Sequence, residues 1–132
     1  MKELISRSTL TWILFTPIAI LNGIIRETTY KNLVGDFAAH QISTIPAIIA
    51  FLVLAYFMLR KSISIATTSQ LFLIGFSWFI VTIIFEFTFG HFMDGNTWQS
   101  LLNDYNLFQG RLWVLFLINE IFTPYFVKKI IN

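Results

Sequence analysis

The sequence contains no cysteine, and only 12% of its 132 residues are charged. The absence of cysteine excludes a small secreted domain held by disulfides and a zinc site built on thiolates. Soluble chains carry about 25% charged residues, because their surfaces have to be solvated. About half that share is too little to cover a soluble domain of this length. A net charge of only +2 also argues against a basic nucleic-acid binder, so no nucleic-acid partner is expected.

The chain is instead rich in apolar and aromatic side chains. Hydrophobic residues make up 56% and aromatic residues 17%, with a mean hydropathy of +0.72. Four apolar blocks run over residues 10–25, 37–59, 71–89 and 112–127. Each is near the length of about 20 residues that crosses a bilayer core of about 30 Å. The sequence therefore predicts an all-α integral membrane protein, with residues 1–132 forming one compact bundle of four transmembrane helices in the lipid bilayer.

Basic residues near the ends of the blocks divide unequally between the two sides. The side that holds both termini carries six of them: Lys2, Arg7, Arg60, Lys61, Lys128 and Lys129. The opposite side, called the outer side below, carries three: Arg26, Lys31 and Arg111. Because lysine and arginine are enriched in cytoplasmic loops, we expect both termini to be cytoplasmic. The same imbalance argues against an antiparallel dimer of two opposite orientations.

The connection between the third and fourth blocks contains a second, shorter helical pattern. Asn96 or Thr97 is suited to cap it. Apolar residues follow at i, i+3, i+4 and i+7: Trp98, Leu101, Leu102 and Tyr105. A stripe of about two turns is long enough to lie at the lipid headgroups but too short to span. We therefore expect an interfacial helix on the outer side, acting as a connector that covers the bundle rather than as a moving lid.

Polar side chains at membrane depth are the strongest indicators of a site, because a charge in hydrocarbon is costly. The candidate ligand-binding residues gather in the outer third of the predicted bundle: Asn22, Arg26, Glu27, His40, Gln41, Thr44, Glu86, His91 and Arg111. Glu86 shares a helical face with the small residues Gly75, Thr82 and Gly90, which indicates that it faces neighbouring helices. We expect a pocket, open to the outer side, for a polar or anionic small ligand.

Structural interpretations of the same residues stay open. Glu86 has a second possible role, neutralising Arg111 or Arg26 and so holding the helices in register. For His40 and His91 a structural or interfacial role is favoured over metal binding, because no ligand spacing typical of zinc or haem accompanies them. The sequence accordingly predicts no metal site and names no cofactor.

Glu120 is expected near the middle of the bilayer, next to Asn119. It lies nine residues after Arg111 and eight before Lys128, and nine residues of helix rise about 13 Å. At 100° per residue it falls on the face opposite Arg111, so the two cannot enter one outer pocket. Three interpretations remain: a polar contact with Asn119 or Gln70, a contact with another subunit, or a protonated, hydrogen-bonded carboxyl.

Three prolines lie inside apolar blocks, and each frees the carbonyl four residues earlier: Pro17, Pro46 and Pro124. Hydroxyls close to them are expected to satisfy these carbonyls in part: Thr16, Thr44 and Thr123.

Four segments of the chain resemble those of small, uncharacterised four-helix bacterial membrane proteins. They are residues 22–27 (NGIIRE), 39–44 (AHQIST), 85–91 (FEFTFGH) and 104–113 (DYNLFQGRLW). The resemblance covers most of the chain and implies a multi-pass protein of the bacterial cytoplasmic (inner) membrane. It brings no activity with it.

Three classes of function follow from these features. The preferred one is a protein that binds, and in an oligomer transports, a small ligand at the outer polar residues. The second is an accessory or structural subunit of a larger membrane complex, whose polar residues pair helices or bind a partner protein. A membrane-embedded enzyme is less favoured, because no catalytic motif is present and no catalytic residue is assigned.

Overall fold

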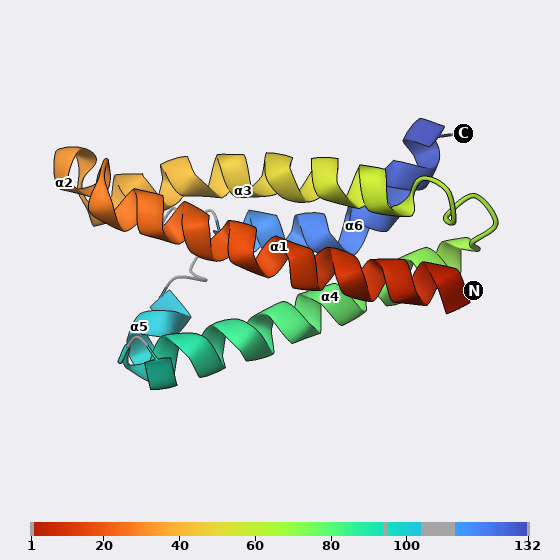
Figure 1. Cartoon of the computed structure of the whole chain (residues 1–132). Coiled ribbons are helices and arrows are strands. Elements are labelled where there is room, and N and C mark those ends of the chain that lie inside the picture. Colours follow the sequence, from red (N-terminus) through yellow and green to blue (C-terminus); the bar gives the residue numbers. More distant parts are fainter. Residues whose placement is uncertain (1, 94, 104–112, 132) are drawn as a thin grey trace.

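The computed structural model describes residues 2–93, 95–103 and 113–131, and every regular element within these ranges is helical. The elements are α1 (Lys2–Thr28), α2 (Lys31–Val34), α3 (Asp36–Leu59), α4 (Thr68–Thr88), its π-helical continuation η1 (Phe89–Met93), α5 (Trp98–Asn103) and α6 (Trp113–Ile131). Both termini lie at one end of the molecule with the connection from α3 to α4, whereas α2 and α5 lie at the opposite end (Figure 1). The prediction of an all-helical chain is confirmed.

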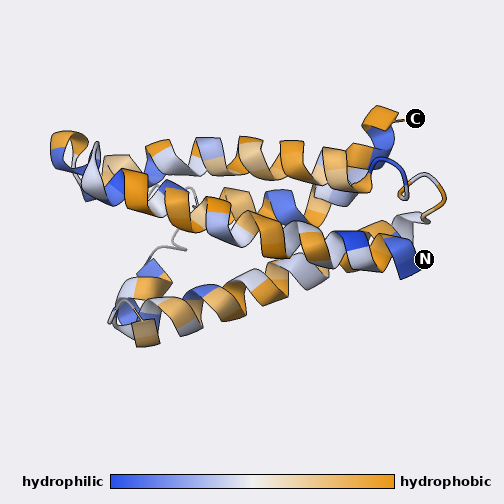
Figure 2. Ribbon diagram, viewed as in Figure 1, coloured by the Kyte–Doolittle hydropathy of each residue, from blue (hydrophilic) through white to orange (hydrophobic). Residues whose placement is uncertain are grey.

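Three of the long helices are suited to cross a membrane by length and composition. They are α1, α3 and α4 with its continuation η1. Large apolar side chains are exposed along them, as Ile13, Ile49 and Ile84 show, and apolar residues predominate along the long helices between their ends (Figure 2). The fourth, α6, has only 19 residues and carries Glu120, Lys128 and Lys129. The structure therefore supports three of the four predicted spans on these criteria.

Aromatic rings form the centre of the bundle, one from each long helix. Phe51 of α3 has no exposed surface, and its ring centroid lies 5.0 Å from that of Phe15 on α1 and 5.1 Å from that of Trp78 on α4. Phe116 of α6 stacks on Phe15 at 5.5 Å. Edge-on and stacked pairs at these distances add to the stabilisation from burial itself. These rings hold the four helices at fixed rotations.

The helices α4 and α6 approach so closely at Gly75 that no larger residue fits. A Cβ atom on Gly75 would lie 2.1 Å from the backbone oxygen of Ile121. Gly75, Thr82 and Gly90 are all buried, as expected for a face turned toward neighbouring helices. The absence of a side chain at Gly75 thus allows the close approach of these two helices.

The ends of two helices are fixed by side-chain caps. Thr67 and Gln70 form a reciprocal capping box at the start of α4. At α5, the Thr97 hydroxyl accepts a hydrogen bond from the Ser100 backbone at 3.1 Å, so Thr97 rather than Asn96 is the cap. The predicted apolar stripe is only partly packed: Leu101 is buried and Leu102 is exposed. Its last member, Tyr105, lies outside the described residues.

All three prolines lie inside helices, but the prediction for the nearby threonines is wrong. Each hydroxyl donates to the carbonyl four residues before the threonine itself, not to the one that the proline frees. The acceptors are the carbonyls of Trp12, His40 and Asn119. A hydroxyl reaches its own preceding turn most easily, and that acceptor prevails here.

Candidate functional site

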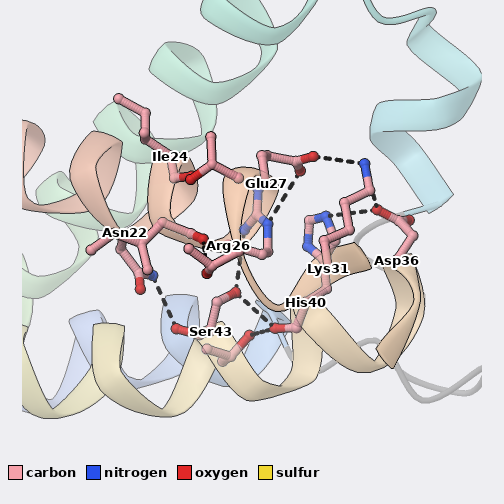
Figure 3. A network of polar contacts seen from close by, with 12 residues as sticks. Asn22, Ile24, Arg26, Glu27, Lys31, Asp36, His40 and Ser43 are labelled. Carbon is pink, nitrogen blue, oxygen red and sulfur yellow. Dashed lines mark hydrogen bonds and ion pairs between the residues drawn. The ribbon is translucent and has the colours of Figure 1, made fainter. Parts of the chain in front are cut away.

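Seven polar side chains lie together where α1, α2 and α3 meet. Asn22 of α1 donates from Nδ2 to the backbone oxygen of Ser43 on α3 at 3.0 Å, and Arg26 donates from Nη1 to Ser43 Oγ at 3.2 Å. The Ser43 hydroxyl in turn donates to the backbone oxygen of His40 at 3.1 Å. Figure 3 shows that Asn22 and Arg26 of α1 both donate hydrogen bonds to Ser43 of α3, so one serine connects the two helices.

A line of charges extends these contacts through α2. Arg26 Nε lies 3.4 Å from Glu27 Oε1, and Glu27 Oε2 lies 2.6 Å from Lys31 Nζ. Asp36 Oδ1 lies 3.5 Å from Lys31 Nζ and 4.0 Å from His40 Nε2 (Figure 3). We call these residues together the α1–α3 cluster: Asn22, Arg26, Glu27, Lys31, Asp36, His40 and Ser43.

Lys31 is the most strongly paired cation of this cluster. Its hydrogen bond to Glu27 raises the pKa of the ammonium above its usual value, and the charge of Asp36 adds to the effect. Lys31 is therefore positive throughout the physiological range.

Arg26 is held differently. Its side chain is only 19% exposed, and its contacts use Nε and Nη1. The remaining nitrogen, Nη2, lies over Gly23, 3.8 Å from where a Cβ would stand, and donates to none of the residues that the structure describes. Since a guanidinium offers a planar set of donors that matches a carboxylate or phosphate, this edge is available to an anion.

The α1–α3 cluster also brings possible metal ligands together. Atoms of Glu27, Asp36 and His40 lie within 4.8 Å of one another. However, the Lys31 ammonium already contacts both carboxylates, at 2.6 Å and 3.5 Å. A metal ion would have to displace the Lys31 ammonium group from both carboxylates, so this geometry favours the ion pairs over a bound metal.

Other predicted site residues make their described contacts elsewhere. Glu86 Oε2 accepts a hydrogen bond from Trp113 Nε1 of α6 at 2.9 Å. His91 lies in η1, with Nδ1 2.9 Å from the backbone oxygen of Asn96, and its ring stacks on Trp98 of α5 at 3.7 Å. These contacts link α4 with α6 and η1 with α5, not with the α1–α3 cluster.

Three further residues were predicted to belong to the site: Thr44, Gln41 and Arg111. Thr44 is buried, and its hydroxyl donates to the His40 backbone oxygen within α3. Gln41 is half-buried on the same helix. Arg111 lies outside the described residues, so the predicted pairing of Arg111 with Glu86 stays a prediction.

Glu120 lies deep in the bundle, with no exposed surface. Its Oε2 accepts a hydrogen bond from Thr82 Oγ1 at 2.8 Å, and Thr82 Oγ1 accepts one from Trp12 Nε1 at 2.9 Å. The polar contact is thus with Thr82, not with Asn119 or Gln70, and a side chain without exposed surface does not reach a second subunit. Glu120 Oε1 and Asn119 Nδ2 are also buried, and neither has a hydrogen-bond partner in the described part of the chain.

Three residues of the α1–α3 cluster were not among the predicted site residues: Lys31, Asp36 and Ser43. Asp36, His40 and Ser43 stand at i, i+4 and i+7 of one helix face, so this spacing could have identified the α3 side of the cluster. Trp113 and Trp12 gave no such signal, because a tryptophan in an apolar helix looks like a packing residue.

Two hollows lie away from the α1–α3 cluster. One, of about 340 Å³, lies between α1 and α4 and is lined in part by Ser8, Thr9, Trp12, Ser77 and Trp78. The other, of about 350 Å³, lies between α3 and α6 and includes Tyr56 and Lys129. Neither includes a residue of the cluster.

No protein-family model, curated protein or solved structure matches the chain.

Proposed function

We propose that the chain is a four-pass protein of a bacterial cytoplasmic membrane, and that the α1–α3 cluster binds a polar or anionic small ligand on the outer side. The fourth span is α6. It packs against both α3 and α4 and runs along the bundle with the other long helices (Figure 1). Of its three charged residues, Glu120 is buried inside the bundle and the two lysines are at its last turn. None of them requires α6 to leave the membrane.

The proposed orientation is supported by where the basic residues lie. The end of the molecule that holds both termini also holds the connection with Arg60 and Lys61 (Figure 1). Lys2, Lys128 and Lys129 belong to the same end, whereas the α1–α3 cluster lies at the opposite one. By the positive-inside rule the cluster faces outward.

The proposal that a ligand binds here rests on the burial and the contacts of Arg26. A half-buried guanidinium with one edge over a glycine offers N–H donors to a carboxylate or phosphate group. Asn22 and His40 lie beside it in the same cluster and can add polar contacts (Figure 3).

Thermal unfolding in lipid nanodiscs tests the proposal. The parent is compared with Arg26→Gln and with the matched control Lys31→Gln, which removes a cation already paired with two carboxylates. Inorganic phosphate, acetate and succinate are added separately. We expect at least one anion to raise the unfolding temperature of the parent and of Lys31→Gln, but not of Arg26→Gln. If no anion stabilises the parent, or if Arg26→Gln responds equally, the proposal is wrong.

A second candidate function is that of an accessory or structural subunit, and the paired contacts of the cluster favour it. Ser43 accepts hydrogen bonds from two α1 side chains, and Lys31 contacts both Glu27 and Asp36. Here Arg26→Gln and Ser43→Ala should each destabilise the anion-free protein, and their effects should not add, because they remove the same contact. Additive effects would leave this second candidate without support.

A further inference from the structure

The Trp12–Thr82–Glu120 chain is independent of the α1–α3 cluster, and the direction of its hydrogen bonds is fixed by chemistry. The indole nitrogen of Trp12 is only a donor, so Thr82 Oγ1 accepts from it. The single hydroxyl proton of Thr82 then points to Glu120 Oε2. Glu120 therefore uses Oε2 as an acceptor, and any proton that the carboxyl holds is on Oε1.

The surroundings of Oε1 do not suit a negative charge. Glu120 has no exposed surface, and none of the residues that the structure describes forms a hydrogen bond with Oε1. Within residues 2–93, 95–103 and 113–131 no lysine, arginine or histidine forms an ion pair with it. The charged group that acts on it from α4 is Glu86, which has the same sign, and no described charged group of α1 or α3 acts on it. An isolated buried carboxylate costs several kcal/mol, and a bound proton removes that cost.

A groove lies on one side of this hydrogen-bonded chain. It runs between α1 and α4 and is mostly apolar, with Ser8, Thr9 and Ser77 among its lining residues together with Trp12. The same Trp12 holds Thr82 through its indole nitrogen. The ring of Trp12 thus stands between the groove and the Thr82–Glu120 pair.

We propose that Glu120 and Thr82 form a proton-binding site in the interior of the bundle, reached from the α1–α4 groove past Trp12. A hydronium ion transfers its proton to Oε1 and leaves a water molecule, and in the reverse step the O–H bond breaks and water takes the proton. The carboxyl thus alternates between the neutral acid and an anion. Because no cation of the described residues pairs with this anion, loss of the proton requires a replacing cation or movement of the helices. The proposal does not depend on ligand binding at the α1–α3 cluster.

Infrared spectroscopy of the protein in lipid tests the proton directly. A protonated carboxylic acid has a C=O band that ionised carboxylates lack. We expect this band in the parent at neutral pH, its loss in Glu120→Gln and its persistence in the control Glu86→Gln. Thr82→Val, which keeps the carboxyl and removes its hydrogen bond, should shift the band, and serves if Glu120→Gln fails to fold. Absence of the band in the parent at neutral pH, with or without sodium, would overturn the proposal.

The rate at which D₂O shifts this band tests the route. We expect Trp12→Phe to speed the exchange several-fold, because it removes the bond to Thr82 and part of the ring. Trp98→Phe is the matched control, since Trp98 lies on α5 at the other end, and should leave the rate unchanged. Equal rates in the parent and Trp12→Phe would exclude Trp12 from the route.

Discussion

The two polar regions of this molecule handle charge in opposite ways. The α1–α3 cluster contains several charged groups, most of them partly exposed and each with at least one partner. The Thr82–Glu120 pair contains one acid, fully buried, with one hydroxyl donor. Because partly exposed ion pairs are weak and a buried charge is expensive, many substitutions in the cluster should have small effects, whereas single substitutions around Glu120 should have large ones.

The largest effect is expected at Gly75, which lies in the buried region between α4 and α6 and allows their close approach. In Gly75→Ala the new Cβ would stand 2.1 Å from the Ile121 backbone oxygen, and backbone cannot move aside as a flexible side chain can. We expect a loss of about 3 kcal/mol or more in unfolding free energy, at or above the usual cost of overpacking.

Gly23→Ala is the matched control on the cluster side. Its nearest new neighbour is Arg26 Nη2 at 3.8 Å, an ordinary contact. It should be neutral or stabilising by up to about 1 kcal/mol, as alanine is the better helix former. Denaturation in detergent measures both variants, and equal stabilities would contradict the close approach of α4 and α6.

Glu120 itself gives the next largest effect. Glu120→Lys places an ammonium group with three N–H donors, which Thr82 alone cannot satisfy, at a position without exposed surface, so insertion and stability should fall by about 3 kcal/mol. Glu120→Gln keeps the shape and an oxygen for Thr82, and should fold about as well as the parent. Membrane yield and unfolding temperature measure both. Severe misfolding of the glutamine variant would show that the negative charge is required.

Trp113→Phe should have an intermediate effect. It keeps an aromatic ring beside Phe116 but removes the donor to Glu86 Oε2, at a cost of about 1–2 kcal/mol. Trp98→Phe is the control, because Trp98 is 48% exposed, and a surface substitution usually changes stability by no more than about 0.5 kcal/mol. Similar losses in both variants would mean that the Glu86 contact contributes nothing.

The smallest effect is expected for Glu27→Gln, which removes the partly exposed partner of Lys31. The folded state raises the pKa of Lys31, so the pair stabilises the protein below the ordinary lysine pKa of 10.5 and loses this effect as pH rises past the folded value. The parent and the variant should differ slightly at neutral pH and become equal in strong alkali or high salt. A difference that persists in high salt would place this pair in a more buried setting.

The fold was largely predictable because length and apolarity alone define the long helices. The predicted blocks 37–59 and 71–89 end close to the observed α3 and to α4 with η1. Which face of each helix turns inward was harder to predict. In a protein that contacts lipid, both the core face and the outer face are apolar, so the hydrophobic pattern does not fix the rotation of a helix.

The same limitation explains what was and was not predicted of the candidate site. Asn22 and Arg26 are four residues apart on α1 and both contact Ser43, and a shared face of this kind follows from helical spacing alone. Their common partner Ser43, and the partner Thr82 of Glu120, depend on how separate helices rotate against each other. In the sequence, this rotation was indicated for α4 by its stripe of small residues, which includes Gly75.

The π-helical turn of η1 changes the direction in which the last residues of this long helix point. One π-turn holds about one residue more than an α-turn, so Met93 is out of step by about 100° with a continuous α-helix. In this phase the Asn96 backbone nitrogen closes on the Gly90 carbonyl at 2.9 Å, and His91 lies flat against Trp98. Removing one residue from this turn would shorten the helix by only about 1.5 Å, yet it would swing α5 away from Gly90. At this point of the chain, the number of residues constrains the structure more than their identity does.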